Sequence, residues 1–98
     1  MGSLYEVDYH YLVAERDIPR LDSFWRKEIK MAIEKKLATT PETFGEPLRR
    51  SLKGYRKLRV GDYRVVFRIE KQTVKILIIE HHSVIYREVY KRVHQPAA

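Results

Sequence analysis

The first half of the chain shows two periodicities of apolar residues, one after the other. Residues 4–10 read LYEVDYH, in which aromatic and β-branched side chains alternate with polar ones. This period of two predicts a β-strand. Residues 11–17 suit a short helix. We expect that helix to end before Pro19, because a proline pushes the preceding residue out of the helical conformation.

A longer helix is predicted between Leu21 and Leu37, where apolar residues recur every four positions. The members of this stripe are Leu21, Trp25, Ile29, Ile33 and Leu37, and Phe24 and Ala32 widen it. Asp22 or Ser23 can cap the start of the helix, which we expect to end near Ala38. Residues 39–47 contain two prolines and a glycine and are predicted to form a loop.

Strand patterns return after Gly54. Residues 55–60 and 63–69 are two predicted strands, and Gly61-Asp62 between them suits the tight turn of a β-hairpin. After a second short turn, residues 73–79 read TVKILII. That stretch becomes apolar on both faces, as in a central strand that is covered on both sides.

The last predicted element is a helix over residues 84–93, which Ser83 can cap. The element order is therefore β-α-α-β-β-β-α. Three consecutive strands at hairpin spacing form an antiparallel meander, and we expect the helices to pack on one face of it, in an α+β fold. The residues expected on one side of the last helix are Tyr86, Val89, Tyr90 and Val93.

Composition supports one small domain over residues 1–98, because 44% of the residues are hydrophobic. There is no cysteine, which suits a reducing compartment. No stretch has the apolar core of a signal peptide or the roughly 20 apolar residues of a membrane span, so we expect a cytoplasmic protein. Residues 1–3 are typical of a tag remnant, and residues 94–98 of a flexible tail.

Positive charge is concentrated in one segment. From Arg49 to Arg68 there are eight Arg or Lys residues and one acidic residue, Asp62, which leaves +7, the formal net charge of the whole chain. Charge of this density repels itself and favours a polyanionic partner. A phosphate backbone is the commonest such partner.

Strand alternation places three of these cations together. If the apolar faces of the hairpin strands pack on the long helix, Lys57, Arg59 and Arg64 converge on the opposite, uncovered face. Cations so close together would repel one another unless a polyanion is bound. His81 and His82 follow the central strand, and we expect them at the rim of the same face.

Residues of these types suit the cleavage of RNA. Attack by the ribose 2′-hydroxyl needs a base, cations that stabilise charge on the phosphate, and an acid for the departing 5′-oxygen. Arginine and lysine supply the cations, and histidine can act as acid or base near neutral pH. Tyr86, also expected at the rim, can stack on an unpaired base.

Each of these residues also has a structural interpretation. A basic strand face can bind nucleic acid without cutting it, and composition alone favours binding over catalysis. The histidines can be surface residues at a hairpin end, and Tyr86 and Tyr90 recur at helical spacing as core residues do. No His, Asp or Glu spacing resembles a metal site. The basic residues that can instead line a solvated approach or form ion pairs are Arg49, Arg50, Lys53, Arg56 and Arg68.

Six stretches of the chain match the sequence pattern of a known family. They are YEV at residues 5–7, AIEKKL at 32–37, GEPLR at 45–49, LKGY at 52–55, LRVGDYRVVF at 58–67, and IEHH at 79–82 followed by Tyr86. The ten-residue stretch is the most specific of them. Together they resemble the RelE/ParE superfamily of toxins from toxin–antitoxin systems.

The resemblance implies a compact β-α-α-β-β-β fold. RelE-type members are endoribonucleases that cut mRNA in the ribosomal A site by 2′-hydroxyl attack, without a metal or cofactor, and so inhibit translation. The resemblance also implies a cognate acidic antitoxin. In the family, a segment of that partner covers the active face and often displaces the last toxin helix, so we expect residues 84–93 to be mobile.

Matched residue by residue, the resemblance gives Lys57 a role in proton transfer or charge stabilisation. It places Arg64 on the scissile phosphate and Tyr86 against a base. Three positions depart from the family pattern, because Tyr55 replaces a second lysine of the ribosome-dependent prototype, His82 an arginine and Glu80 a glycine. Glu80 and His82 could act as a pair of acid and base. The expected catalytic residues are Lys57, Arg64, His82 and Tyr86. The expected RNA-binding residues are Arg49, Arg50, Lys53, Tyr55, Arg56, Arg59, His81 and Tyr90.

Two other functions fit the same resemblance. A ParE-like member would poison DNA gyrase by binding to it and would have no nuclease activity. A relative that has lost its activity would bind only RNA or protein.

Overall fold

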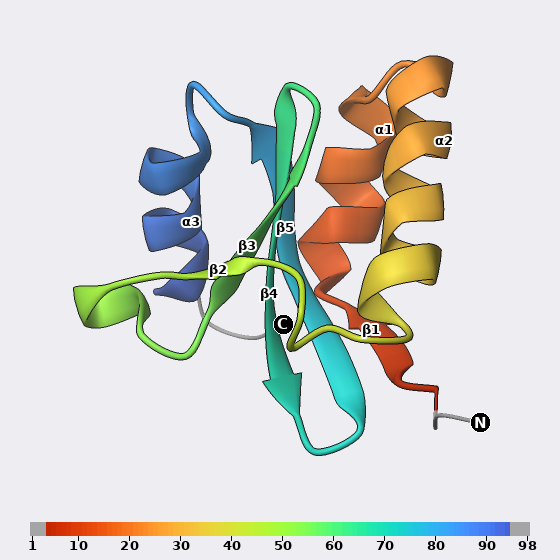
Figure 1. Cartoon of the computed structure of the whole chain (residues 1–98). Helices are drawn as coiled ribbons and strands as arrows, with labels where there is room; N and C mark the ends of the chain where they lie inside the picture. Colours follow the sequence, from red (N-terminus) through yellow and green to blue (C-terminus); the bar gives the residue numbers. More distant parts are fainter. Residues whose placement is uncertain (1–3, 95–98) are drawn as a thin grey trace.

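A five-stranded sheet lies between helices on both of its faces in the computed structural model, which describes residues 4–94 (Figure 1). The strand order is β1-β5-β4-β3-β2, with β3, β4 and β5 antiparallel and β1 parallel to β5. The predicted α+β class and meander are confirmed. The elements are β1 (Glu6–Tyr9), η1 (Val13–Asp17), α1 (Ile18–Arg20), α2 (Ser23–Ala32), η2 (Ile33–Leu37), β2 (Glu46–Pro47), η3 (Arg50–Leu52), β3 (Arg56–Val60), β4 (Tyr63–Glu70), β5 (Thr73–His81) and α3 (Ile85–Val93).

The predicted apolar stripe of the long helix forms the larger core. Asp22 caps α2 by accepting the Trp25 N–H at 3.0 Å, and the helix continues through the π-turn η2 to Ala38, as expected. The core residues from both layers are Val13, Leu21, Ile29, Ile33 and Leu37 on the helical side and Leu58, Val65, Phe67, Val74, Ile76 and Ile79 on the sheet. Phe24 was wrongly assigned to this stripe. It is 62% exposed, since it turns toward the outer side of α2 with Glu28 and Met31.

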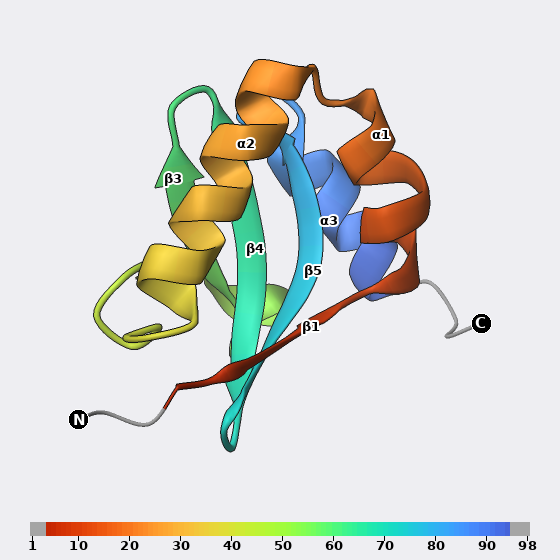
Figure 2. The ribbon, with the colours of Figure 1, turned by 90° about the vertical axis from the view of Figure 1, so that its right-hand side faces the viewer.

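The expectation that all the helices pack on one face is wrong for α3, which covers the opposite face (Figure 2). That face of the sheet is apolar as well, and a bulge in β5 adds a residue to it. Val66 faces Ile78 and Phe67 faces Ile76, so Leu77 has no opposite residue. Leu77 and Ile78 therefore both turn toward α3 and pack in a second cluster. The other buried members of that cluster are Leu52, Val66, Ile85 and Val89.

Several predicted boundaries also differ from the structure. The first helix does not end before Pro19 but reaches Arg20, because Pro19 stands in the first positions of α1, where a missing N–H costs little. The residue at the N-terminal cap of α3 is Val84 and not Ser83. The predicted loop contains β2, and the turn η3 follows it. Both are too short to show a periodicity in sequence.

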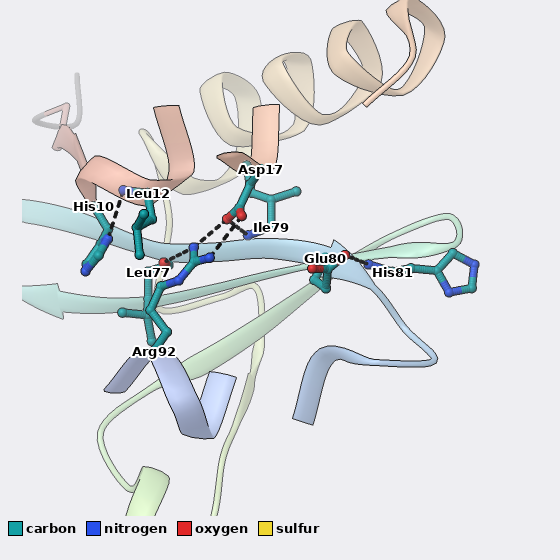
Figure 3. Close-up of polar contacts among 8 residues, drawn as sticks. All are labelled: His10, Leu12, Asp17, Leu77, Ile79, Glu80, His81 and Arg92. Atoms are coloured by element: carbon teal, nitrogen blue, oxygen red, sulfur yellow. Dashed lines mark hydrogen bonds and ion pairs between the residues drawn. The ribbon is translucent and has the colours of Figure 1, made fainter. Parts of the chain in front are cut away.

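One buried ion pair joins the two helical layers at the edge of β5 (Figure 3). β1 ends at Tyr9, so β5 has no neighbour on that side beyond Ile76. Asp17 accepts the Ile79 N–H at 2.9 Å, and Arg92 donates to the Leu77 carbonyl at 3.2 Å. The two side chains also pair with each other at 2.7 Å and are 1% and 5% exposed. Asp17 and Arg92 thus supply the hydrogen bonds that a neighbouring strand would otherwise make to this edge of β5.

Two further expectations concern the ends of the chain and membranes. The predicted remnant at residues 1–3 and residues 95–98 of the predicted tail lie outside the described part of the chain. Within residues 4–94, no helix is long and apolar enough to span a bilayer.

Candidate functional site

The central contact of the site joins β3 to α3. The Lys57 ammonium donates to the Tyr86 hydroxyl at 2.5 Å and lies 5.1 Å from the centre of the Tyr86 ring. Lys57 faces α3 because Leu58, its neighbour in β3, points into the core under α2. Only 19% of the Lys57 side chain is exposed. The tyrosine itself is 54% exposed, so it does not belong to the core.

Glu46 belongs to this site and was missed in the sequence, where residues 39–47 were interpreted as a loop. It lies opposite Lys57 in the β2–β3 pairing, and its carboxylate is 3.9 Å from the Lys57 ammonium. Gly45 has a φ of +89°, and a Cβ there would lie 2.9 Å from the Phe67 ring. A glycine is therefore needed for the chain to pass over the core just before Glu46.

A groove of about 400 Å³ opens beside these side chains. We call it the first groove; its lining residues are Glu46, Pro47, Leu48, Arg49, Leu52, Lys57 and Tyr86. A carboxylate, an ammonium, a phenol and a guanidinium thus meet at one cavity, within the range of roughly 300–1,000 Å³ typical of ligand sites. The expected RNA-binding residue Arg49 lies in this groove. The groove has groups that can accept a proton, donate a proton and neutralise an anion.

Arg59 and Arg64 face each other across β3 and β4 on the same side of the sheet as Lys57. One guanidinium nitrogen of Arg64 donates to the carbonyls of Gly61 and Tyr63, at 2.9 Å each. Among residues 4–94, neither arginine forms an ion pair. The alternation correctly predicted that they share a face with Lys57, but the expectation that this face is uncovered is wrong, because α3 packs on part of it.

His81 does not reach this side of the sheet, contrary to expectation. It stands opposite Tyr63, which packs into the core under α2, whereas Glu80 before it stands opposite Arg64. Successive strand residues point to opposite faces, so Glu80 and His81 cannot both lie on the face of the sheet that carries Lys57. The His81 ring nitrogen Nδ1 lies 2.8 Å from the Ser83 hydroxyl, and the ring points beyond the end of β5 (Figure 3).

His82 stacks on the His81 ring at 4.5 Å, and its backbone N–H bonds to the Asp62 carbonyl at 2.9 Å. Among the described residues, no hydrogen bond or ion pair joins it to Lys57 or Arg64. The structure therefore leaves the expected catalytic role of His82 as a prediction.

The other expected RNA-binding residues are spread around the site. Arg50 and Lys53 are exposed on and after η3. Arg56 points to the opposite face of the sheet from Lys57 and reaches the Gly45 carbonyl at 3.4 Å, because it alternates with Lys57 along β3. Tyr90 is 52% exposed, and its ring centre lies 4.6 Å from that of His94, with the two rings tilted by 35°. It is therefore accessible, but it does not line the first groove.

Tyr55 lies under Arg68, whose guanidinium carbon is 5.8 Å from the ring centre. Arg68 pairs with Glu70 at 2.9 Å, as one of the structural interpretations predicted. A hydrogen bond from Lys75 holds the pKa of the Glu70 carboxyl below its ordinary value, and Arg68 acts in the same direction. Arg68 and Lys75 thus share the Glu70 carboxylate as their ion-pair partner. Across residues 4–94, no three His, Asp or Glu side chains gather closely enough to hold a metal ion.

Sequence comparison gives three matches. The family described as the ParE toxin of the type II toxin–antitoxin system parDE matches residues 12–86. The toxin RelE of Mycobacterium tuberculosis is 34% identical over 84 residues, which cover 81% of this chain and 87% of RelE. The toxin RelG of the same organism is 43% identical over 53 residues, which cover 52% of this chain but only 61% of RelG.

Solved structures show the same fold. The toxin in the RelBE2 toxin–antitoxin complex of M. tuberculosis superposes with a TM-score of 0.75 and 30% identity, over 85% of this chain and 97% of that one. The isolated RelE toxin of Escherichia coli superposes with a TM-score of 0.64 and 22% identity, over 91% and 98%.

Proposed function

Because this chain belongs to the RelE/ParE superfamily of type II toxin–antitoxin toxins, we propose that it is an endoribonuclease that cleaves mRNA on the ribosome and so arrests translation. The observation that carries this proposal is the meeting of Glu46, Lys57 and Tyr86 at the first groove. Arg59 and Arg64 are on the same side of the sheet, with no acidic partner among the described residues. A groove that only bound RNA would not need a carboxylate among its cations, whereas cleavage needs a group that accepts a proton.

The proposed reaction is the attack of a ribose 2′-oxygen on the adjacent phosphorus. The bond from phosphorus to the 5′-oxygen breaks, which leaves a 2′,3′-cyclic phosphate and a 5′-hydroxyl. Glu46, which is 83% exposed and accessible to RNA, takes the proton of the 2′-hydroxyl. Lys57 stabilises the charge on the phosphate and returns a proton to the departing oxygen. The proton taken by Glu46 and the proton given by Lys57 balance the proposed reaction without a metal ion.

The remaining groups bind and orient the RNA. Arg64 holds the cleaved phosphate, since a guanidinium group binds phosphate oxygens through paired hydrogen bonds, and Arg59 opposite it binds the RNA backbone next to that phosphate. The exposed Tyr86 ring, fixed by its hydroxyl on Lys57, supplies a face on which an unpaired base stacks. Arg49 extends the positive surface along the groove.

An acidic antitoxin is the proposed protein partner. The related RelBE2 structure is a toxin–antitoxin complex, and this chain carries a formal charge of +7, which favours an acidic partner. A segment of the antitoxin that covers the first groove would exclude RNA from Lys57 and Arg64. We propose that it competes with α3 for the sheet, which would remove Tyr86 from Lys57.

Cleavage of ribosome-bound mRNA by the purified chain tests the proposed activity. We expect the wild type to cut and Lys57→Met to lose most of its rate, whereas the control Lys91→Met, on the exposed side of α3, keeps it. A wild-type chain that leaves every transcript intact, on ribosomes and as free RNA, would contradict the proposal.

A second candidate function is the inhibition of DNA gyrase, because the matching family is described as the ParE toxin. Mapping of transcript ends after induction in cells separates the two. Cuts in phase with codons support the nuclease. A DNA-damage response with intact transcripts supports the gyrase inhibitor.

A further inference from the structure

A second groove of about 380 Å³ adjoins the first at the outer edge of β3. Its lining residues are Lys36, Phe44, Gly45, Glu46, Lys57, Leu58, Arg59 and Arg64. Glu46 and Lys57 line both grooves, so their contact forms a wall shared by the two. A chain that crosses this wall would occupy both cavities in succession.

The second groove is strongly basic. Four cations line it, and Glu46 is the only acidic lining residue. Lys36 comes from η2, on the other side of the sheet edge, and was not among the expected site residues. Its ammonium lies 5.4 Å from the Phe44 ring centre, and none of the ion pairs among residues 4–94 involves it. Arg59 and Arg64 stand opposite each other, an arrangement that is unfavourable unless an anion lies between them.

The open edge of β3 adds a backbone donor to this groove. β2 pairs with β3 only at Lys57 and Arg56. The Leu48 N–H bonds to the Tyr55 carbonyl, so the odd-numbered residues of β3 turn their backbone groups toward β2. Arg59 is the next odd residue, and β2 has no residue opposite it. Its backbone N–H therefore points outward at the open edge of the sheet, and backbone N–H groups commonly bind phosphate oxygens.

We propose that the second groove binds the phosphodiester that follows or precedes the cleaved bond in single-stranded RNA, and that Lys36 is its outermost cation. This inference rests on the proposed function and extends it. One nucleotide lies in the first groove against Tyr86, the strand crosses Lys57, and the neighbouring phosphate lies between Arg59 and Lys36. The half-buried Phe44 ring forms the wall on which Lys36 rests.

The test uses short RNA in which every ribose carries a 2′-O-methyl group, so that binding is measured without cleavage. Fluorescence anisotropy between 50 and 200 mM salt gives the affinity of the full chain and the salt dependence of that affinity. Lys36→Met is compared with Lys35→Met, which removes an exposed cation from the same turn without touching the groove. We expect weaker binding for Lys36→Met and a logarithmic salt slope smaller by about 0.7, as for the loss of one phosphate contact. Lys35→Met keeps the wild-type values.

Two results would overturn the inference. One is equal affinity and slope for the two variants. The other is a Lys36→Met variant that binds RNA normally but loses affinity for poly-glutamate, which would assign the groove to an acidic protein.

The inference and the proposed function can fail separately. A wild type that binds RNA through Lys36 without cutting ribosome-bound mRNA supports the groove and contradicts the nuclease. A wild type that cuts, with no effect of Lys36→Met on RNA binding, supports the nuclease and contradicts the groove.

Discussion

The ammonium nitrogen of Lys57 and the hydroxyl oxygen of Tyr86 lie 2.5 Å apart, although one residue belongs to β3 and the other to α3. This contact makes the last helix a wall of the first groove. A shift of α3 would change the surroundings of Lys57 at once. The position of one helix therefore controls both the stacking ring and the polar groups beside it.

Substitution of Tyr86 separates the roles of its ring and its hydroxyl. We expect Tyr86→Ala to lower single-turnover cleavage of ribosome-bound mRNA about 5- to 150-fold, because a base–aromatic stack contributes about 1–3 kcal/mol. Tyr86→Phe keeps the ring and loses one hydrogen bond, so we expect a loss of about fivefold. Equal rates for the two variants would show that the ring does not stack on a base.

Two candidates compete for acid–base catalysis, Glu46 and the pair of Glu80 and His82, and one pair of substitutions decides between them. We expect Glu46→Gln to lower the cleavage rate about 10²- to 10⁴-fold, as for the loss of a positioned base. His82→Ala should stay close to the wild-type rate, since His82 contacts His81 rather than Lys57. If Glu80 and His82 form the acid–base pair instead, the two results will be reversed. The RNA affinity of each variant, measured in parallel, shows whether a lower cleavage rate results from weaker binding.

Loss of the buried Arg92 should destabilise the fold. Arg92→Met leaves the Asp17 carboxylate buried without its partner, at a cost of about 3–5 kcal/mol. We expect urea unfolding to show that loss. Lys91→Met, the control on the exposed side of the same helix, should change the free energy of unfolding by less than about 0.5 kcal/mol.

The double variant Asp17→Leu/Arg92→Met removes both charges of the buried pair. It should recover only part of the stability, because no lone charge remains buried but the Ile79 N–H and the Leu77 carbonyl lose their partners. An Arg92→Met variant that is as stable as the wild type would contradict this account of the buried pair.

His10 should make stability depend on pH. Burial lowers the pKa of the imidazole, the nearby Arg92 lowers it further, and Asp17 opposes them. The unfolded chain then binds more protons than the folded one, so the stability gained from neutral His10 is present above its unfolded pKa of about 6.5 and is lost as pH falls below it. Protonation of Nδ1 would also remove the acceptor of the Leu12 N–H, now 3.1 Å away.

The measurement for His10 is the free energy of unfolding from pH 5 to 8. His10→Gln should show a shallower slope than the wild type in that window. An unchanged slope would assign the dependence to other groups.

Local periodicity was enough to predict which cations share a face. The alternation along β3 and β4 placed Lys57, Arg59 and Arg64 together, because a period of two depends only on neighbouring residues. The resemblance to the toxin superfamily added the roles. The α+β class followed from the order of the elements.

Long-range pairing was what the sequence did not show. Glu46 joins the site through a two-residue strand, whose register depends on β3 and not on its own pattern. The bulge at Leu77 shifts the alternation inside β5, so that Leu77 and Ile78 both face α3, on the side of the sheet opposite α2. The turn of His81 away from Arg64 follows from the register of β5 against β4.

The pairing of Asp17 with Arg92 joins positions that are 75 residues apart in the chain. The helix α3 is therefore fixed at both of its ends, by the Asp17 pair near its C-terminus and by the Lys57 contact of Tyr86 near its N-terminus. Any molecule that displaced α3 would also leave the Asp17 carboxylate without its cation, so the free energy of that buried pair is part of the cost of moving the helix.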